Sequence, residues 1–99
     1  MKRTYYLFNP GRLSRKDNTL KFTPVDEEGR EGQVRYIPIE TVDNLFVYGS
    51  LDANSALYNF LGKNQVAVHF FDYYEHYTGS FMPKEYLPTY NSAAIELNL

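Results

Sequence analysis

The sequence has no cysteine, no tryptophan and only two histidines among its 99 residues. Without cysteine there is no disulfide bond, no thiolate metal site and no cysteine nucleophile, and nothing indicates an oxidising compartment. No run approaches the roughly 20 apolar residues that are needed to cross a bilayer. The short apolar stretch after Lys2 and Arg3 ends at Asn9, so no signal peptide is indicated. We therefore expect a cytoplasmic protein without a membrane partner.

Groupings of side chains that could carry out catalysis are also scarce. His69 and His76 flank Asp72 and Glu75, but on strands His69 and Asp72 would point to opposite faces, whereas a metal site needs converging ligands. No serine lies in a G-x-S-x-G elbow. Gly49, ahead of a helix, could direct backbone N–H groups toward an anion, yet one glycine there is more typical of a structural corner. We predict no catalytic residue, metal site or cofactor in this chain.

Aromatic residues are abundant instead. Tyrosine occurs 10 times and phenylalanine 7 times, and 43% of the residues are apolar. Each buried ring removes about 150 to 250 Å² from water, so a few rings can stabilise a small domain without disulfides or metals. A chain of this length fits one domain. We expect aromatic packing to dominate its core.

Charges are unevenly distributed along the chain. The net charge of −2 argues against a surface devoted wholly to nucleic acid. Basic residues nevertheless crowd the first 21 positions, where Asp17 is the only acidic residue. Arg12, Arg15 and Lys16 could contact phosphates, but basic side chains on an exposed edge strand also discourage unwanted strand pairing. The residues by themselves leave both interpretations open.

Runs with strand character follow one another from the N-terminus. Thr4–Phe8 is β-branched and aromatic and precedes the turn residues N-P-G, which favours a hairpin at that point. Leu13–Lys16 and Thr19–Thr23 flank the pair D-N, which tolerates a tight turn. These patterns predict three antiparallel strands within the first 23 residues. The acidic, glycine-containing segment 26–33 is expected to be a solvated hairpin tip.

Further strands are predicted in the rest of the chain. Val34–Ile39 contains Pro38, which belongs on an edge strand or at a strand end. Asn44–Tyr48 is apolar on both faces and should be covered on both sides. Val66–Phe71 can pair with Tyr77–Phe81 through a turn at residues 72–75.

One helix is predicted at Ala53–Leu61, where apolar residues recur at i, i+3, i+4, i+7 and i+8. Asp52 is the expected N-cap and Gly62 the expected stop. The fold class that follows is mainly β (α+β), a small antiparallel β-sandwich with one packed helix.

The composition of the last residues indicates a domain boundary. After two prolines the chain ends within an apolar stretch, as expected of a chain interrupted shortly after its first domain. We assign residues 1–90 to an N-terminal β-sandwich domain. Residues 91–99, which could form one or two helical turns, are the start of a linker helix or a remnant.

Tyrosines gather in the C-terminal half. Tyr73, Tyr74, Tyr77, Tyr86 and Tyr90 cannot all be buried, because each phenol needs a polar partner. Exposed rings with few charges are typical of an interface core or of a base-stacking surface. A tyrosine at the rim of a sandwich would account for any single one equally well.

The order of these segments resembles the N-terminal domain of CRISPR-associated protein one, the integrase subunit of spacer acquisition. The matching motifs are G-R-L-S-R-K-D-N-T-L-K-F (Gly11–Phe22), Y-I-P-I-E (Tyr36–Glu40), L-F-V-Y-G (Leu45–Gly49), V-A-V-H-F-F-D-Y-Y (Val66–Tyr74) and Y-T-G-S-F-M-P (Tyr77–Pro83). The resemblance covers roughly residues 4–85.

The resemblance implies a β-sandwich followed, in the full protein, by a helical catalytic domain that this chain does not contain. That domain would bind Mg²⁺ or Mn²⁺ and act as a DNA endonuclease and integrase. Implied partners are a second copy of the chain, CRISPR-associated protein two and double-stranded DNA as the spacer precursor. From charge we select Arg12, Arg15 and Lys16 as DNA-binding candidates. Phe71, Tyr73, Tyr74 and Tyr77 are our candidates for the dimer interface.

We therefore interpret the chain as a dimerisation and DNA-platform domain that has no catalytic activity by itself. Two alternatives remain. One is a stand-alone β-barrel that binds single-stranded nucleic acid through aromatic stacking and a basic groove. The other is a β interaction domain with no role in nucleic-acid binding.

Overall fold

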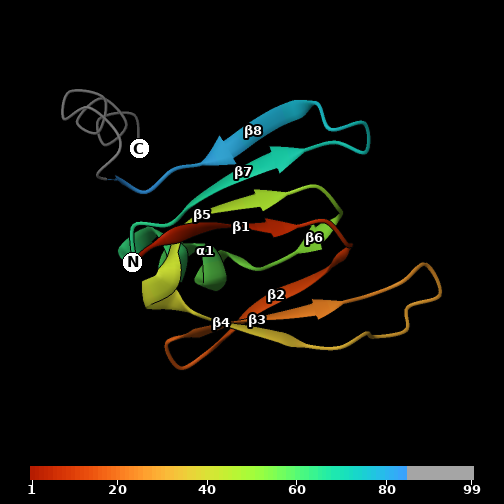
Figure 1. Cartoon of the computed structure of the whole chain (residues 1–99), viewed down its shortest axis with the longest axis horizontal. Coiled ribbons are helices and arrows are strands. Elements are labelled where there is room, and N and C mark those ends of the chain that lie inside the picture. The colour runs from red at the N-terminus through yellow and green to blue at the C-terminus, as the bar shows by residue number, and fades with distance from the viewer. Residues whose placement is uncertain (85–99) are drawn as a thin grey trace.

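The computed structural model describes residues 1–84, which form two layers of strands and one α-helix (Figure 1). The elements are β1 (Arg3–Leu7), β2 (Gly11–Lys16), β3 (Thr19–Pro24), β4 (Arg35–Pro38), a 3-10 turn (Ile39–Thr41), β5 (Val42–Val47), β6 (Leu51–Asp52), α1 (Ser55–Lys63), β7 (Ala67–Phe71) and β8 (Tyr77–Phe81). The proposed boundary at residue 90, the helical turns at 91–99, Tyr86 and Tyr90 lie outside the described residues.

The strands form two four-stranded sheets. Sheet A has the order β1-β5-β7-β8, and sheet B has the order β4-β3-β2-β6. The predicted class, mainly β with one packed helix, is confirmed. Both sheets are mixed rather than purely antiparallel, because β1–β5, β5–β7 and β2–β6 pair in parallel.

The prediction that the first three strands form one antiparallel group is wrong for the first of them. Residues 9 and 10 carry the chain from sheet A to sheet B, and β1 pairs with β5 instead of β2. The crossing is tight: a Cβ on Gly49 would lie 2.7 Å from the backbone nitrogen of Pro10, and Gly11 N donates to the carbonyl of Ser50 at 3.0 Å. The N-P-G signal marks a corner between layers, which local turn chemistry cannot distinguish from a hairpin.

The core between the layers is mainly aliphatic, so the expectation of an aromatic core is wrong. Its buried residues are Leu7, Leu13, Leu20, Phe22, Ile37, Ile39, Val42, Leu45, Val47, Leu57, Phe60, Leu61, Val66 and Val68. Only Phe22 and Phe60 contribute rings to this buried set. Branched aliphatic side chains fill the space between two facing sheets, and most of the rings lie elsewhere.

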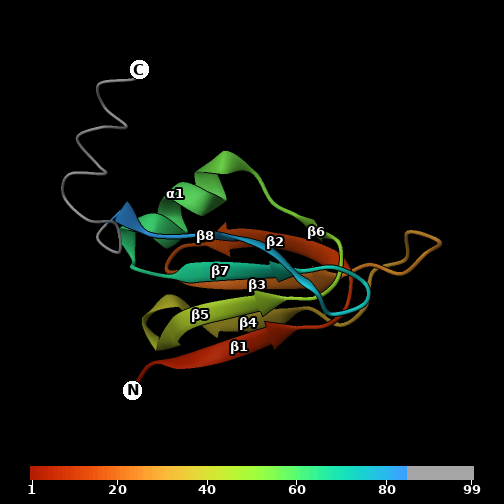
Figure 2. The ribbon, with the colours of Figure 1, turned by 90° about the horizontal axis from the view of Figure 1, so that it is seen from above.

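Helix α1 lies along one side of the strands, next to β2 and β8 (Figure 2). It begins later than predicted, because Asn54 rather than Asp52 is the N-cap: its side chain accepts a hydrogen bond from the backbone N–H of Leu57 at 2.9 Å. Asp52 is held in β6, in register with Arg12. Gly62 is not the stop but an interior residue of the helix, where a Cβ would lie 3.3 Å from the Phe81 ring.

The other turns and strands agree more closely with the predictions. Asp17 adopts a φ of 55° in the β2–β3 turn, and Pro38 ends the edge strand β4. β7 and β8 pair antiparallel around the predicted turn. In β5, Leu45 and Val47 are buried, but Asn44 and Phe46 on the outer face are only half-buried, so the expectation that this strand is covered on both sides is wrong.

Candidate interaction surfaces

The outer face of sheet A is covered by aromatic side chains, which we call the aromatic face. Strand alternation produces it: Leu7, Leu45 and Val68 point into the core, so their neighbours point outward. The aromatic face consists of Tyr6, Phe8, Phe46, Tyr48, Phe71 and Tyr77, contributed by all four strands of the sheet or the residues that directly follow them. Sheet A is largely parallel, and sheets of that kind are usually covered on both faces.

The rings form a connected network. Tyr48 stacks between Phe8 and Phe71, with centroid separations of 5.0 and 4.7 Å. Phe46 meets Tyr6 edge-on at 5.3 Å and lies 5.6 Å from Phe71. These are favourable offset and edge-to-face geometries, which order the rings before any partner arrives. The side chain of Phe8 remains 65% exposed.

A row of polar side chains borders the rings. His69 Nε2 lies 3.1 Å from Asn44 Oδ1, and His69 Nδ1 lies 2.8 Å from Ser80 Oγ. The amide oxygen of Asn44 can only accept, so Nε2–H of His69 donates to it. Ser80 Oγ in turn shares a hydrogen bond of 2.6 Å with the Tyr77 hydroxyl. These hydrogen bonds tie side chains of β5, β7 and β8 together beside the rings.

The four predicted dimer residues fall in two places. Phe71 and Tyr77 lie on the aromatic face. Tyr73 and Tyr74 lie beyond it, in the β7–β8 turn, where their rings pack edge to face at 5.3 Å. Sequence reasoning missed Tyr6, Phe8, Phe46 and Tyr48 as surface residues, although their alternation with buried neighbours was the available signal.

Asp72 organises the β7–β8 turn. Its Oδ1 accepts hydrogen bonds from the backbone N–H groups of Tyr74 and His76, both at 2.9 Å, and Oδ2 lies 3.6 Å from His76 Nδ1. The backbone N–H of His76 is the main reason that the pKa of the Asp72 carboxyl lies below its usual value. The Asp72 side chain thus stabilises the β7–β8 turn. Nowhere in residues 1–84 do three His, Asp or Glu side chains gather as a metal site would require.

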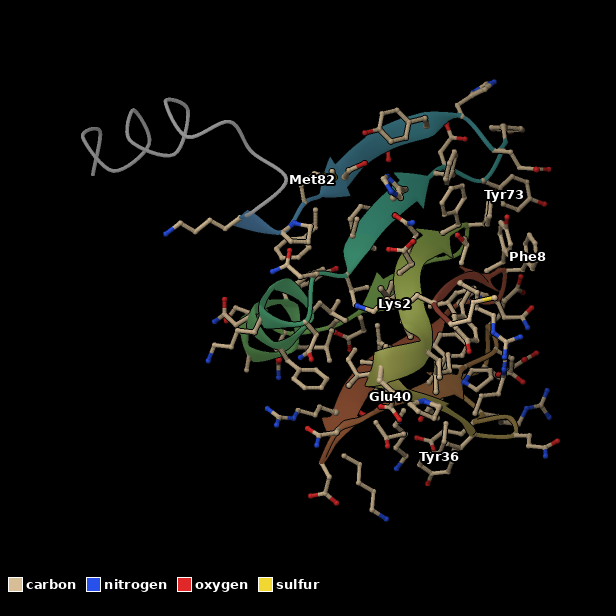
Figure 3. All side chains as sticks on the ribbon, turned by 60° about the vertical axis from the view of Figure 1, so that its left-hand side comes forward. Lys2, Phe8, Tyr36, Glu40, Tyr73 and Met82 are labelled. Carbon is tan, nitrogen blue, oxygen red and sulfur yellow. The ribbon has the colours of Figure 1, made fainter. Side chains whose placement is uncertain are left out.

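Sheet B presents a more polar outer face, which we call the basic face. Ser14 and Lys16 on β2 lie in register with Lys21 and Thr19 on β3, and Lys21 lies opposite Tyr36 on β4. Tyr36 is 55% exposed (Figure 3). Lys21 and Tyr36 were not predicted as site residues, because their position beside Lys16 depends on the strand register.

The three predicted DNA-binding residues do not lie together. Arg12 and Lys16 share the basic face, but Arg12 is ion-paired with Glu31. Arg15 points to the opposite side of β2, where its guanidinium lies 4.1 Å from the centroid of the Phe60 ring. Its Nε also donates to the carbonyl of Asp17 at 2.6 Å. Of the three, Lys16 is the one best placed to contact a phosphate from the basic face.

None of the helices within residues 1–84 has the length and apolarity that a membrane-spanning helix needs.

Comparison with known proteins agrees with the resemblance in the sequence. The family model described as CRISPR associated protein Cas1 matches residues 5–94. The CRISPR-associated endonuclease Cas1 2 of Moorella thermoacetica is 45% identical over 83 residues, which cover 84% of this chain and 24% of that protein. The corresponding Cas1 2 of Thermodesulfovibrio yellowstonii is 39% identical over 87 residues, or 88% of this chain and 24% of that protein. The chain thus spans about a quarter of the length of these curated relatives.

Solved structures share the fold. A CAS1 protein from Thermotoga maritima superposes with a TM-score of 0.72 at 35% identity, over 89% of this chain and 26% of that one. At lower identity the fold alone is shared with TtCas1 in a DNA complex (TM-score 0.59, 16% identity, 78% of this chain and 28% of that one). The same holds for a partial Cas6-RT-Cas1–Cas2 complex (TM-score 0.66, 13% identity, 83% of this chain and 24% of that one). The chain belongs to the CRISPR-associated protein Cas1 family and corresponds to the N-terminal domain region of its members.

Proposed function

We propose that this domain pairs with a second copy of itself through the aromatic face and offers the basic face to double-stranded DNA. In this proposal it is the dimerisation and DNA-platform part of a CRISPR spacer-acquisition endonuclease and integrase. Catalysis, with the Mg²⁺ or Mn²⁺ expected for it, depends on groups outside residues 1–84. The observation that carries the proposal is the aromatic face itself.

An aromatic face of this extent favours a protein partner. The six rings come from all four strands of sheet A or their ends, and several are largely exposed. Monomeric proteins rarely leave a contiguous apolar patch of this kind in water, because its burial is favourable by about 25 cal/mol per Å². Tyrosine and phenylalanine are also enriched in the cores of protein interfaces. A second copy can cover the face by a two-fold axis, with the same rings on both sides.

The alternative of single-strand binding fits this face less well. Stacking on bases would use the rings, but a strand also brings one phosphate for every base. Neither the aromatic face nor its polar row of Asn44, His69 and Ser80 contains a lysine or arginine. Within the aromatic face itself, the phosphates would meet no cation to neutralise them.

The names of two solved structures with this fold support the assignment of DNA and Cas2 as partners. One Cas1 of this fold was solved in a complex with DNA, and another in a complex that contains Cas2. We extend both partners to this chain as part of the proposal. The basic face then supplies the DNA contact, with Lys16, Lys21 and Tyr36 at its centre.

The absolute mass in solution tests the dimer. Light scattering after gel filtration should give a mass near twice 11.6 kDa for the chain. Phe8→Asp should shift the mass toward that of the monomer, because it places a carboxylate among stacked rings in the interface. The matched control is Tyr36→Asp, at a ring of similar exposure on sheet B, which should remain a dimer.

Two outcomes would contradict the proposal. A monomer at every concentration would show that the aromatic face is covered by something other than a second copy. Equal dissociation by Phe8→Asp and Tyr36→Asp would place the contact elsewhere. Circular dichroism of each variant distinguishes loss of pairing from loss of fold.

A further inference from the structure

A groove at one end of the sandwich lies apart from both proposed faces. It is formed where the 24–32 hairpin tip approaches the corner at residues 9 and 10 and the β7–β8 turn, and it encloses about 450 Å³. The hairpin tip and the β7–β8 turn lie at the same end of the molecule in both ribbon views (Figures 1 and 2). We call this hollow the tip groove. Its volume is in the range of sites that hold a small ligand or a few side chains.

The lining of the tip groove is largely apolar. Pro10, Pro24 and Val25 contribute to it from sheet B and the corner, and Tyr73 contributes from the β7–β8 turn. Tyr73 is 89% exposed, and it lies at the same end of the molecule as Phe8 (Figure 3). A ring in this position has a face open to a guest.

The hairpin tip is ordered by backbone hydrogen bonds. Val25 N donates to Pro10 O at 2.9 Å, and Gly32 N donates to Pro24 O at 2.8 Å. Asp26 Oδ1 accepts from the backbone N–H groups of Glu28 and Arg30 at 3.0 and 2.8 Å. A guest therefore meets a largely preformed surface, which lowers the entropy cost of binding.

The charge around the groove is negative. Asp26, Glu27 and Glu31 line it together with one cation, Arg30. Arg30 is already paired with Asp26 at 3.0 Å and with Glu28 at 3.2 Å, and Glu31 is paired with Arg12. Within residues 1–84, Glu27 has no ion-pair partner and stays available to a cation from outside.

We propose that the tip groove binds an arginine- or lysine-bearing segment of a partner protein. The aliphatic stem of such a side chain matches the proline and valine floor, and its charged head can reach Glu27. A guanidinium can also lie over the Tyr73 ring, as Arg15 lies over Phe60 elsewhere in this molecule. DNA is disfavoured, because its phosphates would meet the carboxylates of Asp26, Glu27 and Glu31. None of the lining residues belongs to the aromatic face or to the centre of the basic face at Lys16, Lys21 and Tyr36.

Binding can be tested on the full 99-residue chain with a defined probe. The probe is the blocked pentapeptide Gly-Leu-Arg-Leu-Gly, and the control peptide has glutamine in place of arginine. Titration at low salt, followed by backbone amide NMR, should give saturable shifts concentrated at residues 9, 11, 25–32 and 73. The glutamine peptide should bind more weakly, and salt should reduce the difference between the two.

Variants separate the groove from its surroundings. Tyr73→Ala should weaken binding about two- to fivefold, the range expected for loss of an exposed cation–π contact. Glu27→Gln should remove most of the preference for arginine over glutamine. Tyr36→Ala is the matched control, because Tyr36 is an exposed tyrosine that neither lines the groove nor contacts Tyr73. Binding to Tyr36→Ala should equal that of the parent chain.

Three results would overturn the proposal. The first is a failure of the peptide titration, seen either as no saturable shifts at the groove or as equal binding of the arginine and glutamine peptides. The second is perturbation of the same amides by a short DNA duplex with an affinity that matches the peptide. The third is concentration-dependent shifts without peptide at the amides of residues 25–32, which lie outside the aromatic face; these would make a second copy the occupant. A failed dimer test leaves these readouts interpretable, since none of them uses the aromatic face.

Discussion

Among residues 1–84, three residues other than glycine have a positive φ: Asp17 at 55°, Gln65 at 61° and Glu75 at 65°. Aspartate is among the residues that tolerate this conformation, but glutamate and glutamine are not favoured there. Glu75 is held by its backbone, since its N–H donates to the carbonyl of Asp72 at 3.0 Å. The β7–β8 turn therefore carries a local cost that its hydrogen bonds offset.

Replacing Glu75 with glycine should stabilise the fold. Glycine adopts a positive φ without a Cβ clash. The free energy of unfolding should therefore rise by about 1 kcal/mol, after allowance for the greater entropy of glycine in the unfolded chain. The midpoint of urea unfolding should rise accordingly. Glu27→Gly is the control, because Glu27 has no positive φ and should gain nothing. A lower midpoint for Glu75→Gly would mean that contacts of the Glu75 side chain stabilise the fold by more than its positive φ destabilises it.

At the scale of elements, the start of α1 shows how a cap is selected. Asp52 and Asn54 are both good N-cap residues, and they are two positions apart. Asn54 has the extended backbone that a cap requires, with φ −95° and ψ 171°. Asp52 is part of β6, so the short parallel pairing with β2 decides where the helix begins.

The two positions can be compared directly. Asn54→Ala should destabilise the domain by about 1 kcal/mol, the usual cost of losing an N-cap side chain. Asp52→Ala should cost much less, since its side chain caps nothing in the helix. Thermal unfolding of both variants by circular dichroism measures the difference. Equal losses would contradict the assignment of Asn54 as the cap.

At the scale of the whole molecule, the two sheets turn different surfaces to the outside. The aromatic face belongs to sheet A, and the basic face belongs to sheet B. The core fills the space between them, so a partner on one face does not block the other. Pairing through sheet A would leave both basic faces of a dimer free for DNA.

DNA binding should therefore depend on the basic face and weaken as the salt concentration rises. Replacing Lys16 and Lys21 together by glutamine should lower the slope of log K against log salt by about 2, if each lysine neutralises one phosphate. Fluorescence anisotropy with a duplex at several salt concentrations gives that slope. Arg15→Gln is the control, since Arg15 lies over Phe60 on the opposite side of β2. A larger effect from Arg15 than from the lysine pair would remove the basic face from the proposal.

The degree to which sequence predicted the site differs between residues. Phe71 and Tyr77 were recognised as surface aromatics, because strand runs and the β7–β8 turn are local patterns. Tyr6 and Phe8 were predicted to lie on a strand but not on an outer face, since nothing local tells which side of a strand meets the other sheet. Arg12 and Arg15 were grouped by proximity in sequence, yet alternation along β2 and the ion pair to Glu31 separate them.

The sequence alone determined the strand segments, the existence of one helix and the family, because these depend on residue periodicity, turn chemistry and motif order. Only the tertiary structure decided that β1 joins β5 in parallel, that the rings form one outer face, and that the hairpin tip and Tyr73 enclose a groove. The reason is physical. Each of these features joins residues that are tens of positions apart in the chain, and such pairings are selected by burial of the whole core rather than by local preference.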